Sequence, residues 1–305
     1  MSGRILITGG TGLIGTRLSE MLIDLGYEVA HLSRQSSPYS HYKTFKWDIH
    51  QHYIDDNILN YADYIINLAG ASVADGKWTP ERKREIMDSR VKSTTLLRDC
   101  LRETQHQVKA FISASAVGIY GNTHNHLVTE ESALGDDFLA DVCKQWEAAA
   151  WQVRDLGIRT GIFRIGVVLS DKGGALPQIA KPVKLMAGAP LGSGKQYMSW
   201  IHLDDLCRLF IQAIEDPQYQ GVFNAVAPNP VTNQEFTKVL AHVMHKPLTG
   251  LKVPAIGLKL VLGEMSEVVL EGQRVSANKV LHKGFTFEYS EVQGALESFY
   301  ALEKS

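Results

Sequence analysis

The stretch ITGGTGLIG, residues 7–15, has the residue types and spacing that bind a phosphate group. It carries two overlapping patterns, Gly9-x-x-Gly12-x-x-Gly15 and Gly10-x-Gly12-x-x-Gly15, between an apolar run and a helical pattern. Glycines allow a tight turn that brings backbone N–H groups close to a pyrophosphate, and the dipole of the following helix favours the anion. The alternative, a glycine-rich turn without a ligand, fits this strand-to-helix context less well. The stretch therefore predicts a dinucleotide-binding loop.

The end of the expected second strand indicates which dinucleotide binds. Folds that prefer NAD place an acidic residue about 20 positions after the glycines, where it bonds the ribose hydroxyls. Here that place reads HLSRQ and contains Ser33 and Arg34 but no carboxylate. An arginine there could pair with a 2′-phosphate through a bidentate, charge-assisted contact; the alternative is a solvated arginine at a strand end. We expect NADP(H), with NAD(H) the less favoured cofactor.

Strands and helices that alternate through the first 170 residues must position this loop. Strands are expected in RILITGG, YEVAHLS, TFKWD, DYIINLAG, KAFISASA and RTGIFRIGVVL. Helices are expected before Gly26, which suits a C-cap, from Pro80 to about Glu103, and after the GDD that precedes Phe138. Continuous apolar strands joined by crossover helices predict an α/β fold with a Rossmann-type doubly wound parallel sheet.

The remainder of the chain predicts a smaller C-terminal substrate-binding lobe. We assign residues 1–170 to the nucleotide-binding domain, to which 200–230 return, and 171–305 mainly to the lobe. Thr232 and Glu235 have the spacing of a capping box at the start of a helix. A C-terminal helical segment is expected from about residue 250, with apolar patterns over 254–262 and 291–302.

The composition is typical of a soluble globular protein, with 45% apolar residues, 21% charged residues and a formal net charge of −2. Such a charge creates no basic field for nucleic acid or an anionic membrane, and no apolar run reaches the roughly 20 residues of a spanning helix. Three widely spaced cysteines and the lack of a signal-peptide pattern favour a reducing compartment. We expect a cytoplasmic protein with a small-molecule substrate, no nucleic-acid or membrane partner and no metal site; a homo-oligomer remains open.

Several further motifs carry a family resemblance. TGGTGLIG, NLAG, SASAVGIYG and WIHLDDL occur in the order and spacing of the extended short-chain dehydrogenase/reductase superfamily, which the chain resembles. SRQ, WD, DSRVKSTTLL, FLADVCKQWEAAA, GSGKQYMSWIHLDDL and VLEGQRVSANKVLHKGF narrow the resemblance to the atypical YfcH-like "epimerase family" proteins. The resemblance runs from end to end and implies an NADP-binding protein of the epimerase/dehydratase type.

The resemblance also implies roles for the matched positions. Ser33 and Arg34 would hold the 2′-phosphate end of NADP, and Asp48 would lie by the adenine. Glu85 and Arg90 would reach the cofactor from the helix that starts at Pro80, although exposed helical charges are more often solvated. In full, the candidate cofactor-binding residues are Thr8, Gly9, Gly10, Thr11, Gly12, Leu13, Ile14, Gly15, Ser33, Arg34, Asp48, Asn67, Leu68, Ala69, Gly70, Glu85, Arg90, Ser113 and Val168.

The stretch FLADVCKQWE departs from the superfamily's catalytic pattern. That pattern pairs a Ser or Thr with a Tyr-x-x-x-Lys, whose tyrosine transfers a proton while the lysine lowers its pKa. Ser115 keeps the serine, in a match to the S-x-x-x-Y-G turn with one residue inserted, and Ser113 is its alternate. One alignment puts Leu139 and Cys143 at the tyrosine and lysine places, and a second puts Ala140 at the tyrosine place. Neither alignment restores the pair.

Another group would have to replace the missing phenol. We expect Ser115 to find a partner outside this helix, and Tyr120 is the first candidate, with a packing role as its alternative. Cys143 would be a nucleophile only beside a cation and is better read as a buried thiol. The acidic run from Glu130 to Asp137 could supply a base but is better read as a solvated loop with a helix N-cap. The candidate catalytic residues are therefore Ser115 and Tyr120.

Two functions remain in competition. The first is an NADP-dependent reductase, dehydratase or epimerase that acts on a small hydroxyl- or carbonyl-bearing substrate, such as a nucleotide-sugar. The second is a catalytically silent sensor or scaffold that binds NADPH. The retained serine and the large second lobe favour the enzyme, whereas the missing Tyr-x-x-x-Lys pair favours the sensor.

Overall fold

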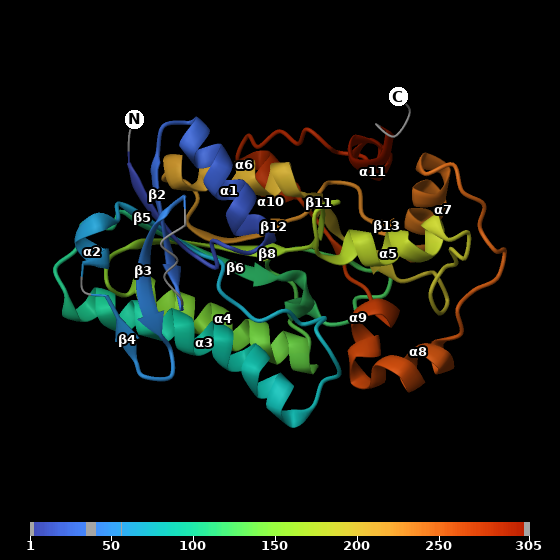
Figure 1. The fold of residues 1–305 in the computed structure, drawn as a ribbon, viewed down its shortest axis with the longest axis horizontal. Helices are drawn as coiled ribbons and strands as arrows, with labels where there is room; N and C mark the ends of the chain where they lie inside the picture. Colours follow the sequence, from blue (N-terminus) through green and yellow to red (C-terminus); the bar gives the residue numbers. More distant parts are fainter. Residues whose placement is uncertain (1–2, 35–40, 56, 302–305) are drawn as a thin grey trace.

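The computed structural model describes residues 3–34, 41–55 and 57–301. Gln35 of the SRQ motif and Leu302 at the end of the expected last helix lie outside these ranges. Figure 1 shows a central sheet with helices on both faces and a cluster of short helices at one end.

The central sheet has eight strands within the described ranges. Seven are parallel, and the edge strand β4 is antiparallel to β3. The strand order reverses at β1, with β5 on one side and β2 on the other, and this reversal confirms the doubly wound Rossmann-type fold. From edge to edge the strands are β12 (Gly221–Ala225), β8 (Arg159–Ile165), β6 (Ala110–Ala116), β5 (Tyr64–Asn67), β1 (Arg4–Thr8), β2 (Glu28–Ser33), β3 (Lys43–Asp48) and β4 (Tyr53–Ile54).

Helices cover both faces of the sheet because its strands are apolar on both sides. Alternate residues of β1 enter different cores: Ile5 and Ile7 pack with α1 and α6, whereas Leu6 packs on the opposite face with α3 and α4. Figure 1 shows these two helix pairs above and below the sheet. The helices are α1 (Leu13–Asp24), α6 (Leu203–Glu215), α3 (Pro80–Glu103) and α4 (Phe138–Arg154), with the short α2 (Ile58–Tyr61) at one end.

The predicted helix ends are confirmed by their capping contacts. Gly26 follows α1 with φ of +84°, a conformation that glycine adopts without a Cβ penalty. Thr79 caps α3 by accepting from the backbone N–H of Arg82, and Pro80 occupies the first turn. Thr232 and Glu235 form a complete capping box at the start of α7.

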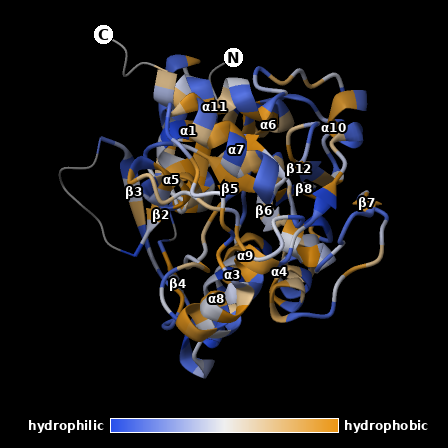
Figure 2. Ribbon diagram, turned by 90° about the vertical axis from the view of Figure 1, so that its right-hand side faces the viewer, coloured by the Kyte–Doolittle hydropathy of each residue, from blue (hydrophilic) through white to orange (hydrophobic). Residues whose placement is uncertain are grey.

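The second lobe lies at one end of the sheet, and its helices face the viewer in Figure 2. Its core joins α5, α7 and α11 through side chains that include Leu176, Phe236 and Leu296. Between its segments, α6 and β12 return the chain to the main domain. The elements are β9 (Val167–Leu169), α5 (Ala175–Lys184), β10 (Tyr197–Met198), β11 (Trp200–His202), β13 (Val231–Thr232), α7 (Asn233–Val243), α8 (Ala255–Leu262), α9 (Glu267–Leu270), α10 (Asn278–His282) and α11 (Val292–Tyr300). Two 3₁₀ turns, Val117–Tyr120 and Gly263–Ser266, and the pair β7 (Leu127–Val128) with β14 (Arg274–Val275) complete the chain.

The expectation of one continuous strand in RTGIFRIGVVL is wrong. The chain leaves the sheet at Gly166, where a Cβ atom would lie 2.4 Å from the carbonyl oxygen of Ser199. Beyond this glycine, β9 pairs with β11 instead of with the central sheet. The close approach therefore redirects the strand towards the second lobe. No helix in the described ranges is long and apolar enough to cross a membrane.

Candidate functional site

The glycine loop between β1 and α1 has positions at which any side chain would clash with neighbouring atoms. Gly9 has φ of +68°, and the N–H of Gly12 donates to its carbonyl at 3.0 Å. A Cβ on Gly15 would lie 2.4 Å from that same carbonyl, and one on Gly10 would lie 2.4 Å from the ring of His31. Gly12 is the N-cap of α1 and has no side chain to cap it, so the first N–H groups of the helix suit an external anion.

A buried polar network fixes the strand ends beneath this loop. The Thr8 hydroxyl donates to Asn67 Oδ1 at 2.8 Å and accepts from the N–H groups of Leu68 and Ala69, each at 3.0 Å. Asn67 Nδ2 in turn donates to the hydroxyls of Thr94 (2.9 Å) and Ser113 (3.1 Å). The structure thus brings the predicted residues of β1, β5 and β6 together; Thr94 was not predicted.

His31 supports the loop from below and was also missed by the sequence analysis. Its Nε2 lies 2.8 Å from Ser19 Oγ, and because that hydroxyl donates to Gly15 O, the histidine is the donor. The ring stacks on Tyr42 with centroids 4.4 Å apart. Burial lowers the pKa of His31 to about 4, so the ring is neutral at physiological pH.

The pKa of His31 predicts a pH-dependent stability. Because its pKa is lowered on folding, the unfolded chain binds the proton first, and stability falls as pH drops from about 6.5 towards 4. The slope for one such proton is at most about 1.4 kcal/mol per pH unit. Urea unfolding across this range should show a steeper decline for the native protein than for His31→Gln, which cannot take up the proton. Parallel declines would contradict the role of His31.

Ser33, Arg34 and Asp48 lie at the same edge of the sheet. Arg34 is exposed immediately after Ser33 at the end of β2, and β3 runs beside it with Ser33 paired to Lys46. The Asp48 carboxylate ends β3 and accepts from the N–H groups of the next turn, at 2.9 Å and 3.1 Å. Both strands end on the side of the glycine loop because they run parallel to β1.

Arg90 and Glu85 start from the same helix but reach different surroundings. Arg90 is mostly buried, with its guanidinium carbon 5.2 Å from the ring centre of Trp146, and a Cβ on Gly70 would lie 2.9 Å from that carbon. Burial lowers its pKa. Glu85 is exposed and forms a 2.6 Å ion pair with Arg82. The structure therefore places Arg90 beside the strand end and Glu85 at the surface.

Ser115 and Tyr120 belong to a buried network centred on an ion pair that the sequence analysis missed. The Ser115 hydroxyl donates to Glu147 Oε1 at 2.7 Å, and Glu147 pairs with Arg164 through two bonds of 2.8 Å and 2.9 Å. Arg164 also donates to the Tyr120 hydroxyl, which donates to Asn224 Oδ1 at 2.7 Å. Ser115 therefore has a hydrogen-bond partner on α4 itself, Glu147. The expectation of a catalytic partner outside this helix stays a prediction.

The Tyr120 phenol and the Cys143 thiol both stay protonated at neutral pH. Burial raises the pKa of Tyr120 to about 12, against the opposing effect of the nearby Arg164. Burial likewise raises the pKa of the Cys143 thiol to about 12, so the thiol is not an activated nucleophile. Leu139, which one of the two alignments puts at the tyrosine place, packs in an apolar cluster with Trp78 and Met265.

The acidic run before α4 has structural contacts. Asp137 caps α4 by accepting from the N–H of Ala140 at 2.9 Å. Glu130 accepts from the N–H of Asn224 at 2.7 Å. These contacts support the reading of this run as a loop with a helix N-cap.

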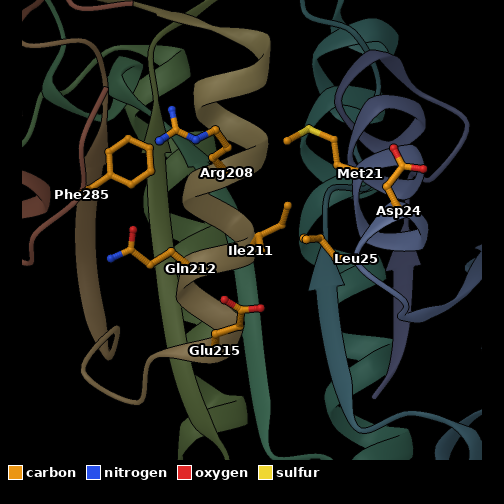
Figure 3. A pocket seen from close by; sticks show the side chains of 8 residues that line it. All are labelled: Met21, Asp24, Leu25, Arg208, Ile211, Gln212, Glu215 and Phe285. Atoms are coloured by element: carbon orange, nitrogen blue, oxygen red, sulfur yellow. The ribbon is translucent and has the colours of Figure 1, made fainter. Parts of the chain in front are cut away.

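Residues of α1 contribute to the lining of two separate cavities. One of about 400 Å³ opens at the loop and is lined in part by Thr11, Gly12, Leu13 and Lys172. Val168 lies nearby on β9: a Cβ on Gly174, in the turn after β9, would lie 3.2 Å from Leu13 and 3.8 Å from the carbonyl oxygen of Val168. The other, shown in Figure 3, is a groove between α1 and α6 that contains none of the predicted site residues. Its lining residues are Met21, Asp24, Leu25, Arg208, Ile211, Gln212, Glu215 and Phe285.

Comparison with known proteins identifies the family. Residues 5–226 match the family described as "NAD dependent epimerase/dehydratase family". Residues 253–299 match a second one, described as "Domain of unknown function (DUF1731)". The chain therefore belongs to the NAD-dependent epimerase/dehydratase family, as its motifs indicated.

Individual relatives resemble the chain over nearly its full length. The epimerase family protein YfhF of Bacillus subtilis is 37% identical over 304 residues and covers 99% of each chain. The crystal structure of human epimerase family protein SDR39U1 (isoform 2) with NADPH is 31% identical, has a TM-score of 0.87 and covers 98% of this chain and 99% of that one. UDP-glucuronic acid 4-epimerase of Bacillus cereus, solved with UDP-glucuronic acid and NAD, has a TM-score of 0.79 over 98% of both chains. Its identity is 17%, so this likeness shows the fold alone.

Proposed function

We propose that the chain is an NADP(H)-dependent enzyme of the reductase, dehydratase or epimerase type, with a small hydroxyl- or carbonyl-bearing substrate. The observation that carries the cofactor assignment is the exposed Arg34 at the end of β2, where an NAD-preferring site would hold a carboxylate. The 31% identical human relative whose structure contains NADPH supports the same choice.

The residues of the glycine loop fit a dinucleotide. Side chains at Gly10 and Gly15 would collide with neighbouring atoms, so only glycine permits this close turn. The uncapped N–H groups in the first turn of α1 would then bind the pyrophosphate. Arg34 would hold the 2′-phosphate, Asp48 would lie by the adenine, and Val168 on β9 would lie near the nicotinamide. When bound, the dinucleotide supplies or accepts a hydride at its nicotinamide carbon.

Arg90 would supply the positive charge that the superfamily takes from lysine. It lies beside Gly70 at the end of β5 and near Cys143, which occupies the lysine place in one alignment. A guanidinium stays protonated even when burial lowers its pKa, so the charge persists at neutral pH. Arg90 would therefore stabilise negative charge at the site without exchanging a proton itself.

The orientation of Ser115 favours the alternative function, a catalytically silent NADPH-binding sensor or scaffold. Its proton points to Glu147, so towards a ligand the hydroxyl offers an acceptor and not the donor that a carbonyl oxygen requires. Ser113 likewise donates to the backbone carbonyl of Ala114 at 3.1 Å. A substrate that binds Ser115 through its own hydroxyl would satisfy this geometry.

Isotope exchange distinguishes the two functions. NADPH deuterated at the nicotinamide C4 is incubated with the protein and a panel of ketones, enones and keto-sugars. In parallel, NADP⁺ is incubated with the protein and hydroxyl-bearing sugars and sugar nucleotides deuterated at their carbinol carbons. An enzyme transfers deuterium between the cofactor and at least one compound, detected by mass spectrometry, and Ser115→Ala lowers this transfer at least 100-fold while the Kd for NADPH changes less than twofold. Tight NADPH binding with no transfer throughout the panel would instead support the sensor. An absence of NADPH binding would contradict both functions.

A further inference from the structure

The helix α8 exposes aliphatic side chains that a folded protein normally covers. Leu251, Ile256, Leu260 and Val261 are 74%, 76%, 77% and 68% exposed, and no residue of α8, all of which are described, is buried. Ile256 and Leu260 are four residues apart and share one face, with Val261 beside them. Leu258 and Leu262 of the same helix are half-buried, and Lys259 is exposed. Exposed aliphatic side chains in such number mark a surface that another surface normally covers.

The chain on both sides of α8 holds the helix in this position. Before it, the N–H of Gly192 donates to Val253 O at 2.9 Å. After it, Met265 packs against the apolar cluster around Trp78, and Lys83 forms an ion pair with Glu264. The helix is therefore fixed at its ends, and it lies at the periphery of the lobe (Figure 1).

Two segments of the lobe are rich in lysine although the chain is nearly neutral, while two exposed acidic residues, Glu264 and Glu267, follow α8. Residues 172–203 and 236–263 contain eight lysines and no Asp or Glu, so the rest of the chain is more acidic than the total of −2. The two segments pack together: the N–H of Thr249 donates to Gly188 O at 3.1 Å. The exposed Lys252 and Lys259 flank the aliphatic residues directly. Lys184 and Lys246 line a cavity in the same lobe with two histidines.

Aliphatic side chains bordered by lysines match the interface of an anionic bilayer. Side chains of this type enter the boundary between headgroups and acyl chains, while lysines bind the negative surface. A second copy of the chain fits less well, because pairing two α8 faces would bring lysines against lysines. Nucleic acid would be attracted by the lysines but would leave the aliphatic residues exposed.

We propose that α8 and the preceding segment, residues 251–261, dock the protein on an anionic membrane surface. The attachment is peripheral and independent of the cofactor function. The expectation of no membrane partner rested on the total charge and on the lack of a spanning segment. The lysine-rich segments and the exposed α8 favour a membrane partner instead.

Vesicle sedimentation of the full chain tests this proposal. The protein should sediment with vesicles of phosphatidylglycerol and phosphatidylcholine, less so in high salt, and much less with phosphatidylcholine alone. The double variants Ile256→Ser/Leu260→Ser and Lys252→Gln/Lys259→Gln should each lower the partition coefficient at least about tenfold. These side chains are exposed, so circular dichroism and NADPH titration should show that both variants retain the native fold.

Matched substitutions on the opposite end of the molecule provide the control. Ile23→Ser/Leu25→Ser removes two aliphatic residues at the C-terminal end of α1 that are 46% and 57% exposed, and Lys109→Gln removes an exposed lysine. Both should sediment as the native protein does. The proposal is overturned if the native protein stays in solution with anionic vesicles, or if the control variants lose as much binding as the α8 variants. It is also overturned if Ile256→Ser/Leu260→Ser dissociates a dimer in analytical ultracentrifugation, because a second copy would then cover the face.

Discussion

Replacing Glu147 by glutamine should destabilise the protein by about 3–5 kcal/mol, the cost typical of removing one partner from a buried ion pair. The side chains of Glu147 and Arg164 are only 7% and 6% exposed, and the variant would leave the guanidinium charge buried without a counter-charge. Equilibrium urea unfolding measures the loss. The effect should exceed that of most single substitutions, because Arg164 also holds Tyr120 and the carbonyl of Glu130.

Two controls separate the charge from the shape of the site. Glu147→Met combined with Arg164→Met should be less destabilised than Glu147→Gln, because no unpaired charge remains. Lys92→Ala, which breaks the exposed pair with Asp88, should cost less than about 1 kcal/mol. A loss below about 1 kcal/mol for Glu147→Gln would show that water compensates the guanidinium and that the network is not a structural centre.

The ion pair also shows how α4 is attached to the sheet. Residues 139, 143 and 147 follow one face of the helix at intervals of four, and Glu147 makes the polar contact on this face. Ser115 meets the carboxylate there, while Leu139 joins the cluster around Trp78. The helix is thus attached by the ion pair at one position and by apolar packing at another.

Local rules were enough to predict most of the main fold. The apolar runs, the proline and threonine at the start of α3 and the glycine after α1 are signals carried by neighbouring residues, and the structure follows them. The break at Gly166 was missed because it depends on Ser199, which is remote in the sequence. The exposure of α8 was missed for a similar reason, since an apolar pattern predicts a helix but does not reveal what covers it.

The sequence predicts the part of the site that depends on backbone conformation. It does not predict contacts between side chains that come from several elements. The glycine spacing identifies the loop because sterics require glycine at Gly10 and Gly15. In contrast, Arg164 lies in a strand that reads as apolar, and its partner Glu147 is recognisable only when β8 and α4 are seen together. His31 is equally hidden, since its contact with Ser19 joins β2 to α1.

Arg34→Ala should raise the Kd for NADPH about 10- to 100-fold while changing the Kd for NADH less than twofold. A charge-assisted contact contributes about 1.5–3 kcal/mol, and only NADPH carries the 2′-phosphate that would receive it. Fluorescence titration of both dinucleotides measures the two affinities. Arg154→Ala, which removes an exposed arginine from the far end of α4, is the matched control and should change neither.

Lysine at the same position separates charge from geometry. Arg34→Lys keeps the positive charge but loses the planar fork, so it should recover only part of the NADPH affinity. The loss should also shrink as salt is added, because Arg34 is exposed and its field is screened. Equal losses for NADPH and NADH in Arg34→Ala would contradict the 2′-phosphate contact. Such losses would mean that Arg34 supports the end of β2 as a whole, so that the cofactor preference must come from elsewhere at this sheet edge.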